Sequence, residues 1–238
     1  MSSIRDQQAR EAVLRRIRTA LRDVPEDEQP QQVAVERNYV HEATAPRDEI
    51  IEQFIERVSD YKATVRRVEE HDLPRTIAAS CKEHSVQMLV VAADMPVEWL
   101  PSDITILRDA QKQPLPYEQL EQSDGVLIGC ALGIAQTGTI VLDGGKLQGR
   151  RVLSLLPDYA LCLIWEEQIV GIVPEAIARL NEPTDDGTHM RPLTFVSGPS
   201  ATSDIELSRV EGVHGPRTLE VFVVRDKSQG DHKGTPLL

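Results

Sequence analysis

Three stretches in the second half of the chain contain more glycine, serine and threonine than ordinary connections require. In the first, residues 134–142, Thr137, Gly138 and Thr139 stand between apolar residues of strand type. Glycine lets a ligand or another strand approach the backbone closely, and the two hydroxyls could donate to an anion. The same pattern is also typical of a glycine bulge in a sheet, where threonine is a common strand residue. Spacing alone leaves both interpretations open.

The second stretch, residues 194–206, joins a strand-like run to a Ser-Gly-Pro-Ser loop and then to a helix N-terminus predicted at residues 203–206. The first amides of a helix have no intrahelical partner and bind anions, and ligands of open α/β sheets lie beyond the carboxyl ends of the strands. A well-capped helix without a ligand fits the pattern equally well. The ligand-binding candidates of this stretch are Ser197, Gly198, Ser200 and Asp204.

The third stretch, residues 211–217, comes immediately before the last predicted strand. His214 is expected on a constrained loop, where it is the candidate catalytic residue; a histidine that only hydrogen-bonds to backbone is the alternative. Asp204 then either caps its helix or orients His214. Arg217 can hold a carboxylate or phosphate through two parallel hydrogen bonds. The ligand-binding candidates here are His214, Gly215 and Arg217.

The chemistry of the three stretches predicts one cleft, at the carboxyl edge of a sheet, that binds a small carboxylate or phosphate. The sequence contains no P-loop, dinucleotide fingerprint, nucleophile elbow or histidine pair with metal-ligand spacing. We therefore predict no metal site. Cys81, Cys130 and Cys162 are odd in number, widely separated and close to apolar runs. They are predicted to be buried, reduced thiols in a reducing compartment, and not a disulfide framework or cluster site.

The elements that must position these stretches alternate between helices and buried strands from residue 48 onward. Continuous apolar runs of strand length predict strands that are covered on both faces. The fold class is therefore α/β, a parallel-rich sheet with helices on both faces. Helices are predicted around residues 50–58, 74–81 and 173–180, and strands at residues 64–68, 88–92, 104–107, 126–128 and 219–224.

The chain begins with an arginine-rich amphipathic helix over residues 4–22 and a polar linker, which together make an N-terminal arm of residues 1–46. Asp6 and Glu11 disfavour a transit peptide, so we expect this helix to pack on its own acidic domain; a partner or a membrane surface is the alternative. The α/β domain is predicted to span residues 47–226, and residues 227–238 to be a disordered tail.

Composition narrows the class of protein further. A chain of 238 residues is long enough for a self-sufficient core. Its formal net charge of −12 argues against a nucleic-acid-binding protein, which needs a basic face. No window approaches about twenty apolar residues, and the N-terminus lacks the apolar core of a signal peptide. We expect a cytoplasmic protein with no membrane span.

The stretches together resemble the LUD-domain family. The strings that carry the resemblance are residues 135–142 (AQTGTIVL), 154–158 (SLLPD), 197–206 (SGPSATSDIE) and 213–217 (VHGPR), in the family's order and within residues 120–225. The resemblance implies a fold like the ribose-phosphate isomerase and CoA-transferase superfamily. It also implies a role in bacterial L-lactate use, in which three proteins act together to oxidise lactate to pyruvate. The iron–sulfur clusters of that reaction are expected on partner subunits, with no cofactor bound by this chain alone.

The chain departs from the family pattern at three positions, where Ala131, Gln136 and Ala160 replace two acidic residues and a histidine. These losses remove the most plausible acid–base groups and favour binding over stand-alone catalysis. The predicted function is an accessory subunit of a lactate-oxidising iron–sulfur complex that binds a small anion. The alternatives are a stand-alone phosphosugar isomerase or acyl/CoA transferase that uses His214 or Arg217, and a regulator that senses a small acid.

Overall fold

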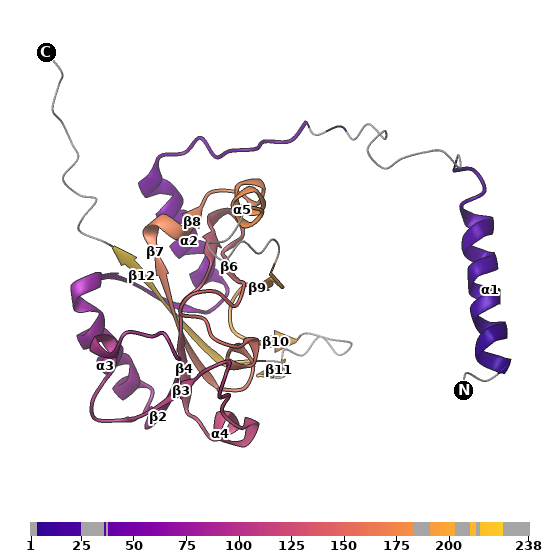
Figure 1. Cartoon of the computed structure of the whole chain (residues 1–238). Coiled ribbons are helices and arrows are strands. Elements are labelled where there is room, and N and C mark those ends of the chain that lie inside the picture. Colours follow the sequence, from indigo (N-terminus) through magenta and orange to yellow (C-terminus); the bar gives the residue numbers. More distant parts are fainter. Residues whose placement is uncertain are drawn as a thin grey trace, which may run out of the picture. The chain divides into compact units, whose positions relative to one another are not determined.

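The computed structural model describes residues 4–24, 36, 38–182, 191–202, 210–212 and 215–225. The chain divides into two compact units, Met1–Tyr39 and Val40–Leu238. In the first unit, helix α1 spans Ile4–Ala20 and confirms the predicted arginine-rich helix (Figure 1). The predicted tail at residues 227–238 lies outside the described residues. None of the helices in the described ranges is long and apolar enough to cross a membrane.

The second unit is built on a six-stranded sheet with the strand order β1-β12-β7-β4-β2-β3. All neighbouring strands of this sheet are parallel, which confirms the predicted fold class. The strands predicted from apolar runs are all present, whereas the central strand β7 was not predicted. The strands are β1 (Thr64–Glu69), β2 (Met88–Ala92), β3 (Thr105–Asp109), β4 (Gly125–Ile128), β7 (Tyr159–Trp165) and β12 (Thr218–Arg225).

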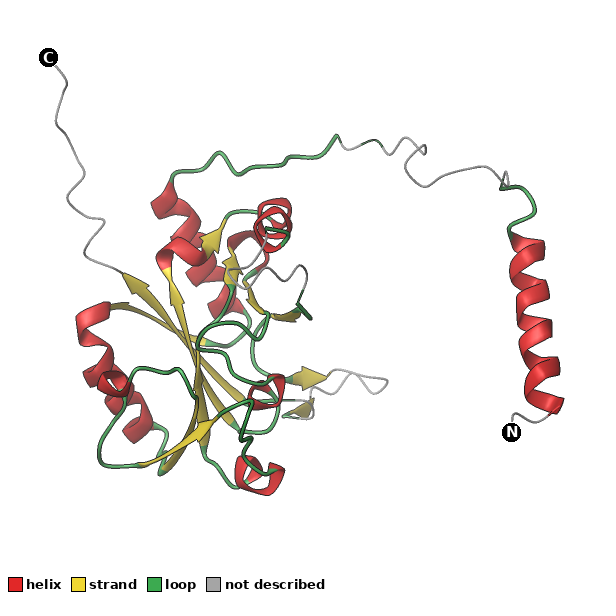
Figure 2. Cartoon of the chain, viewed as in Figure 1, coloured by secondary structure: helices red, strands yellow, loops and turns green. Residues whose placement is uncertain are grey.

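Both faces of this sheet are buried, because side chains alternate along each strand. On one face, Leu161 and Leu163 of β7 pack with helix α3 (Leu73–Glu83). On the other face, Cys162 and Ile164 pack with helix α2 (Arg47–Asp60) and with Leu120 of the short helix α4 (Tyr117–Glu121). Figure 2 shows the helices on the two sides of the sheet.

A smaller sheet, which the sequence did not predict, covers part of the second face. It has the order β8-β5-β6-β9, with antiparallel β5–β6 and β6–β9 pairs and a parallel β5–β8 pair. Its inner side packs on the large sheet through Ile140 and Leu142, and its outer side packs on helix α5 (Val173–Leu180). The strands are β5 (Leu132–Ile134), β6 (Thr139–Leu142), β8 (Ile169–Val170) and β9 (Thr194–Val196); β10 (Ala201–Thr202) and β11 (Val210–Glu211) form a separate antiparallel pair.

The three cysteines are buried free thiols, as predicted. Burial raises the pKa of the Cys81 thiol to about 11. Burial, with the neighbouring Cys162 thiol, also raises the pKa of Cys130 well above its ordinary value. The thiolate is the form of cysteine that acts as a nucleophile or binds a metal. The raised pKa values therefore indicate that these side chains serve mainly to fill the core.

Candidate functional site

The Thr-Gly-Thr stretch is built mainly to let two elements pack closely. Gly138 adopts a left-handed backbone conformation, with φ of 58°, after the short turn of residues 135–137. A Cβ at this position would lie 2.7 Å from the carbonyl carbon of Arg57 in α2, so only glycine fits. The hydroxyl of the buried Thr139 lies 2.8 Å from the hydroxyls of both Thr137 and Ser197. These threonines therefore support the Ser197–Ser200 loop from behind.

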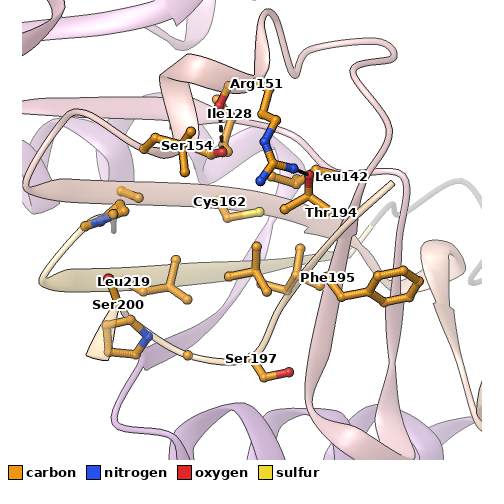
Figure 3. Close-up of a pocket in the computed structure, with 18 of the residues that line it drawn as sticks. Ile128, Leu142, Arg151, Ser154, Cys162, Thr194, Phe195, Ser197, Ser200 and Leu219 are labelled. Carbon is orange, nitrogen blue, oxygen red and sulfur yellow. Dashed lines mark hydrogen bonds between the residues drawn. The ribbon is translucent and has the colours of Figure 1, made fainter. Parts of the chain in front are cut away.

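That loop closes one side of a cavity of about 310 Å³, which we call the apolar cavity (Figure 3). Its walls come from both sheets and are mostly aliphatic. In Figure 3, Cys162 and Leu219 lie between the Ser197–Ser200 loop at one end and Arg151 with Thr194 at the other, and the Phe195 ring points away. The aliphatic and sulfur-bearing lining residues include Ile128, Ile140, Leu142, Ala160, Cys162 and Leu219.

Backbone hydrogen bonds bring the second and third predicted stretches together at this cavity. The amide of Ser200 donates to the carbonyl of Pro216 at 2.8 Å, and the amide of Gly212 donates to the carbonyl of Ser200 at 2.9 Å. Gly215 and Pro216 consequently line the same cavity as Ser197, Gly198 and Ser200. Gly198, with φ of 84°, packs so closely on Tyr61 that a Cβ would lie 2.6 Å from the Tyr61 Cβ.

The remaining predicted residues either lie away from the apolar cavity or fall outside the described residues. Arg217 does not line the apolar cavity; it borders another cavity, of about 540 Å³, together with His84 and Asp158. Its Nε lies 3.6 Å from an Asp158 oxygen, and both side chains are largely exposed. Asp204 and His214 lie outside the described residues, as does the helix start predicted at residues 203–206. The described chain after Ser200 enters β10.

The predicted position at the carboxyl edge of the sheet is wrong for these loops. Gly215 and Pro216 come immediately before β12, and Ser154, which also lines the cavity, comes shortly before β7. The apolar cavity therefore borders the amino-terminal ends of these two parallel strands. The reason is that β9, which feeds the Ser197–Ser200 loop, belongs to the smaller sheet, where it is antiparallel to β6. The carboxyl-edge rule applies only to strands of the parallel sheet.

A second cavity, which sequence reasoning missed, does lie at the carboxyl edge of the parallel sheet. It has a volume of about 710 Å³ and is reached by Asp94 beyond β2 and Gln111 beyond β3. We call it the basic cavity, because four cations and two carboxylates line it: Lys146, Arg150, Arg151, Arg191, Asp94 and Asp143. The available signal was the run of residues 143–151 (DGGKLQGRR), which places three glycines and three cations directly after a strand.

Internal hydrogen bonds hold this 143–151 loop. The buried side chain of Gln148 accepts from the amides of Asp143 and Gly144 at 2.8 and 3.1 Å and donates to the Asp143 carboxylate at 2.7 Å. The amide of Leu147 donates to Asp94 at 2.8 Å. These bonds satisfy the loop's own polar groups, so the loop is a fixed platform for its charged side chains.

Arg150 anchors the platform to the sheet. Its Nε and Nη2 donate to the two oxygens of the buried Asp109 at 2.8 and 2.7 Å. Burial alone would raise the pKa of Asp109, but hydrogen bonds from Arg150 and from the Leu115 amide outweigh it and hold the pKa below its ordinary value. The charge of Arg150 is therefore already neutralised.

The other cations of the basic cavity differ in their partners. Arg191 faces Asp143, with 3.8 Å between nitrogen and oxygen. The Nη1 of Arg151 donates to the Thr194 hydroxyl. Within the ranges that the structure describes, neither Arg151 nor Lys146 forms an ion pair. These two side chains can receive an anion.

The two cavities adjoin each other. Five residues line both, and Arg151 is the charged one among them: Ile128, Leu142, Arg151, Ser154 and Thr194. Of the three departures from the family pattern, Ala160 lines the apolar cavity, whereas Gln136 is exposed and the Ala131 amide donates to the carbonyl of Val141 in the smaller sheet. Among the described residues, the apolar cavity contains neither a carboxylate nor an imidazole. Its chemistry suits binding better than proton transfer.

Comparison with known proteins identifies relatives of the whole α/β domain. A family model described as the LUD domain matches residues 51–224. The chain is 46% identical over 182 residues to Lactate utilization protein C of Deinococcus radiodurans, covering 76% of this chain and 82% of that protein. It is 35% identical over 120 residues to Lactate utilization protein C of Shouchella clausii, covering 50% and 51%. A crystal structure of a DUF162 family protein from Deinococcus radiodurans aligns with a TM-score of 0.63 at 40% identity, covering 76% of this chain and 99% of that one.

Proposed function

Because this chain belongs to the LUD-domain family, we propose that it is an accessory subunit of a bacterial complex that oxidises L-lactate to pyruvate. The observation that carries the proposal is the similarity to Lactate utilization protein C of Deinococcus radiodurans. The two chains are 46% identical over a segment that covers 82% of that protein. The relatives' names support lactate use. The family pattern lost at Ala131, Gln136 and Ala160 supports an accessory role and not a catalytic one.

Oxidation of a 2-hydroxy acid releases two electrons, so the complex needs a carrier. We assign that carrier to iron–sulfur clusters on partner subunits. The cysteines of this chain do not suit a cluster, because they are buried in the core and two of them have raised pKa values. A cytoplasmic location, predicted from these unpaired thiols, belongs to the same proposal.

The chain's own contribution is to bind a small carboxylate or phosphate in the cleft formed by the two cavities. Ser197, Gly198, Ser200 and Gly215, which were predicted as ligand-binding residues, line its apolar part. Arg151 takes the cationic role that the sequence analysis gave to Arg217, because it lines both parts of the cleft. An arginine can hold a carboxylate or phosphate through paired hydrogen bonds.

The test is complementation in a bacterium that lacks its own Lactate utilization protein C. We expect the chain to restore growth on L-lactate and to leave growth on pyruvate unchanged, because pyruvate lies after the oxidation step. An affinity tag on the chain should then recover an iron–sulfur protein from lactate-grown cells. Folded, expressed protein that neither restores growth nor recovers such a partner would overturn the proposal.

A further inference from the structure

The size of the cleft points to a ligand larger than lactate. The apolar cavity measures about 310 Å³ and the adjoining basic cavity about 710 Å³. Cavities of roughly 300–1,000 Å³ bury most of the surface of a drug-sized molecule. A two- or three-carbon acid would leave most of this apolar surface in contact with water, which is unfavourable.

The chemistry of the cleft is divided along its length. The apolar cavity is walled by aliphatic side chains of both sheets, and Figure 3 shows Arg151 at the end away from the Ser197–Ser200 loop. Arg151 also lines the basic cavity, and so does Lys146 of the same 143–151 loop. An occupant must therefore be apolar over one part and anionic at the other.

The charge balance supports an anion at that end. Of the four cations, Arg150 is bound by Asp109 and Arg191 faces Asp143. The carboxylate of Asp94 accepts the Leu147 amide. Lys146 and Arg151 remain without an ion pair in the described part of the chain, and both side chains are exposed to the cavity solvent. A carboxylate or phosphate placed between them would gain charge-assisted hydrogen bonds.

We propose that the cleft binds an organic anion with a substantial apolar body. The anionic group lies between Lys146 and Arg151, and the apolar body lies in the apolar cavity against Cys162 and Leu219. This inference rests on the ligand-binding part of the proposed function and revises its ligand: the carboxylate or phosphate is one end of a larger molecule and not a small acid by itself. It is independent of the part that concerns lactate oxidation.

The test uses two fluorescent probes that differ by one sulfonate group: anilinonaphthalene sulfonate, which is an anion, and phenylnaphthylamine, which lacks the sulfonate and is neutral. Titration of the full chain should show one saturable site for each. We expect the sulfonate probe to bind roughly tenfold more tightly, because it alone reaches the two cations. Equal affinity for the two probes, or no saturable binding, would overturn the proposal.

Matched variants locate the site. Arg151→Gln and Lys146→Gln should each weaken sulfonate binding several-fold and leave the neutral probe unchanged. Ser200→Phe, which adds bulk to the wall of the apolar cavity, should weaken both probes. Arg75→Gln is the control, since its side chain is 82% exposed on α3, across the large sheet. Arg75→Gln equalling the effect of Arg151→Gln would contradict the assignment.

The two proposals fail in different ways. Loss of probe selectivity with intact growth on L-lactate removes this inference alone. Selective probe binding without complementation removes the lactate role and leaves the ligand class standing. All variants are exposed or lie on the cavity wall, and circular dichroism melting checks that each is folded.

Discussion

Two regions of the large sheet bury a carboxylate, and they differ in what surrounds it. Asp109 at the end of β3 binds Arg150, whereas Glu220 in β12 accepts from Tyr159 and Ser80 and pairs with Arg66. Around Glu220 the carboxylates outnumber the arginines, because Arg66 is shared between Glu220 and Glu83. Around Asp109 the neighbouring Lys146 and Arg151 have no carboxylate partner in the described ranges. A surplus of cations, and not a buried carboxylate, therefore distinguishes the candidate anion site.

The Glu220 cluster is the more demanding of the two to disrupt. Its Tyr159 hydroxyl lies 2.7 Å and its Arg66 Nε 2.7 Å from the carboxylate, and burial raises the pKa of Tyr159. Glu220→Ala should lower the free energy of unfolding by about 3–5 kcal/mol, because it leaves these donors unpaired. Urea denaturation measures this loss. Tyr159→Phe should lower the same free energy by about 1–2 kcal/mol. If Glu220→Ala lowers it by less than Tyr159→Phe is expected to, the cluster does not stabilise the fold.

Asp109→Asn should lower the free energy of unfolding by less than Glu220→Ala does, by about 2–3 kcal/mol at neutral pH. The reason is that Arg150 is partly exposed, so water replaces part of the lost pairing. The folded-state pKa of Asp109 lies below its ordinary value of 3.8, so the pair stabilises the protein above that pH. This stability is lost as the pH falls through the folded-state pKa. The difference between wild type and Asp109→Asn should shrink as the pH falls below 3.8. A difference that stays constant with pH would contradict the ion pair.

Salt concentration should affect the candidate anion site more than the Glu220 cluster, and probe binding measures this difference. Lys146 and Arg151 are exposed, so their attraction for an anion is screened at high ionic strength, whereas the buried Glu220 cluster is affected much less. Affinity for anilinonaphthalene sulfonate should fall several-fold between about 0.05 and 0.5 M salt. The neutral probe serves as the control and should bind equally or slightly better. The same salt dependence for both probes would rule out a charged contact.

Arg217→Gln is expected to have the smallest effect. Arg217 and Asp158 are both mostly exposed and 3.6 Å apart, so their pairing is worth less than about 0.5 kcal/mol. Sulfonate binding should also be unchanged, because Arg217 borders another cavity. Should this variant weaken binding while Arg151→Gln does not, the assignment made from the sequence would be restored.

Most strands of the large sheet could be predicted from the sequence, because a mainly apolar run of strand length can be recognised without knowing its partners. Residues 88–92 are apolar throughout and residues 219–224 are apolar except for Glu220, and these runs match β2 and most of β12. The smaller sheet escaped prediction because its strands have two to four residues, and the β6–β9 pair joins segments far apart in the chain. Short strands of this kind are defined by their partners and not by their own composition.

The candidate site was only partly predictable for a similar reason. The Ser197–Ser200 loop and Gly215 were recognised from their composition, and the structure places them on one cavity. The 143–151 loop was missed, because cations on a loop are common in any sequence. Only the fold shows that Arg150 is paired with Asp109, whereas Arg151 can still bind an anion. Gly138, in turn, was recognised as special, but its reason is the close approach of Arg57.

The most direct test of the account is native mass spectrometry of the chain purified from lactate-grown cells. Wild type is expected to retain an organic anion with an apolar body, Arg151→Gln is expected to lose it, and Arg217→Gln is expected to keep it. Retention by Arg151→Gln with loss from Arg217→Gln, or no retained molecule in wild type, would contradict the claim that the cleft beside Arg151 is the ligand site.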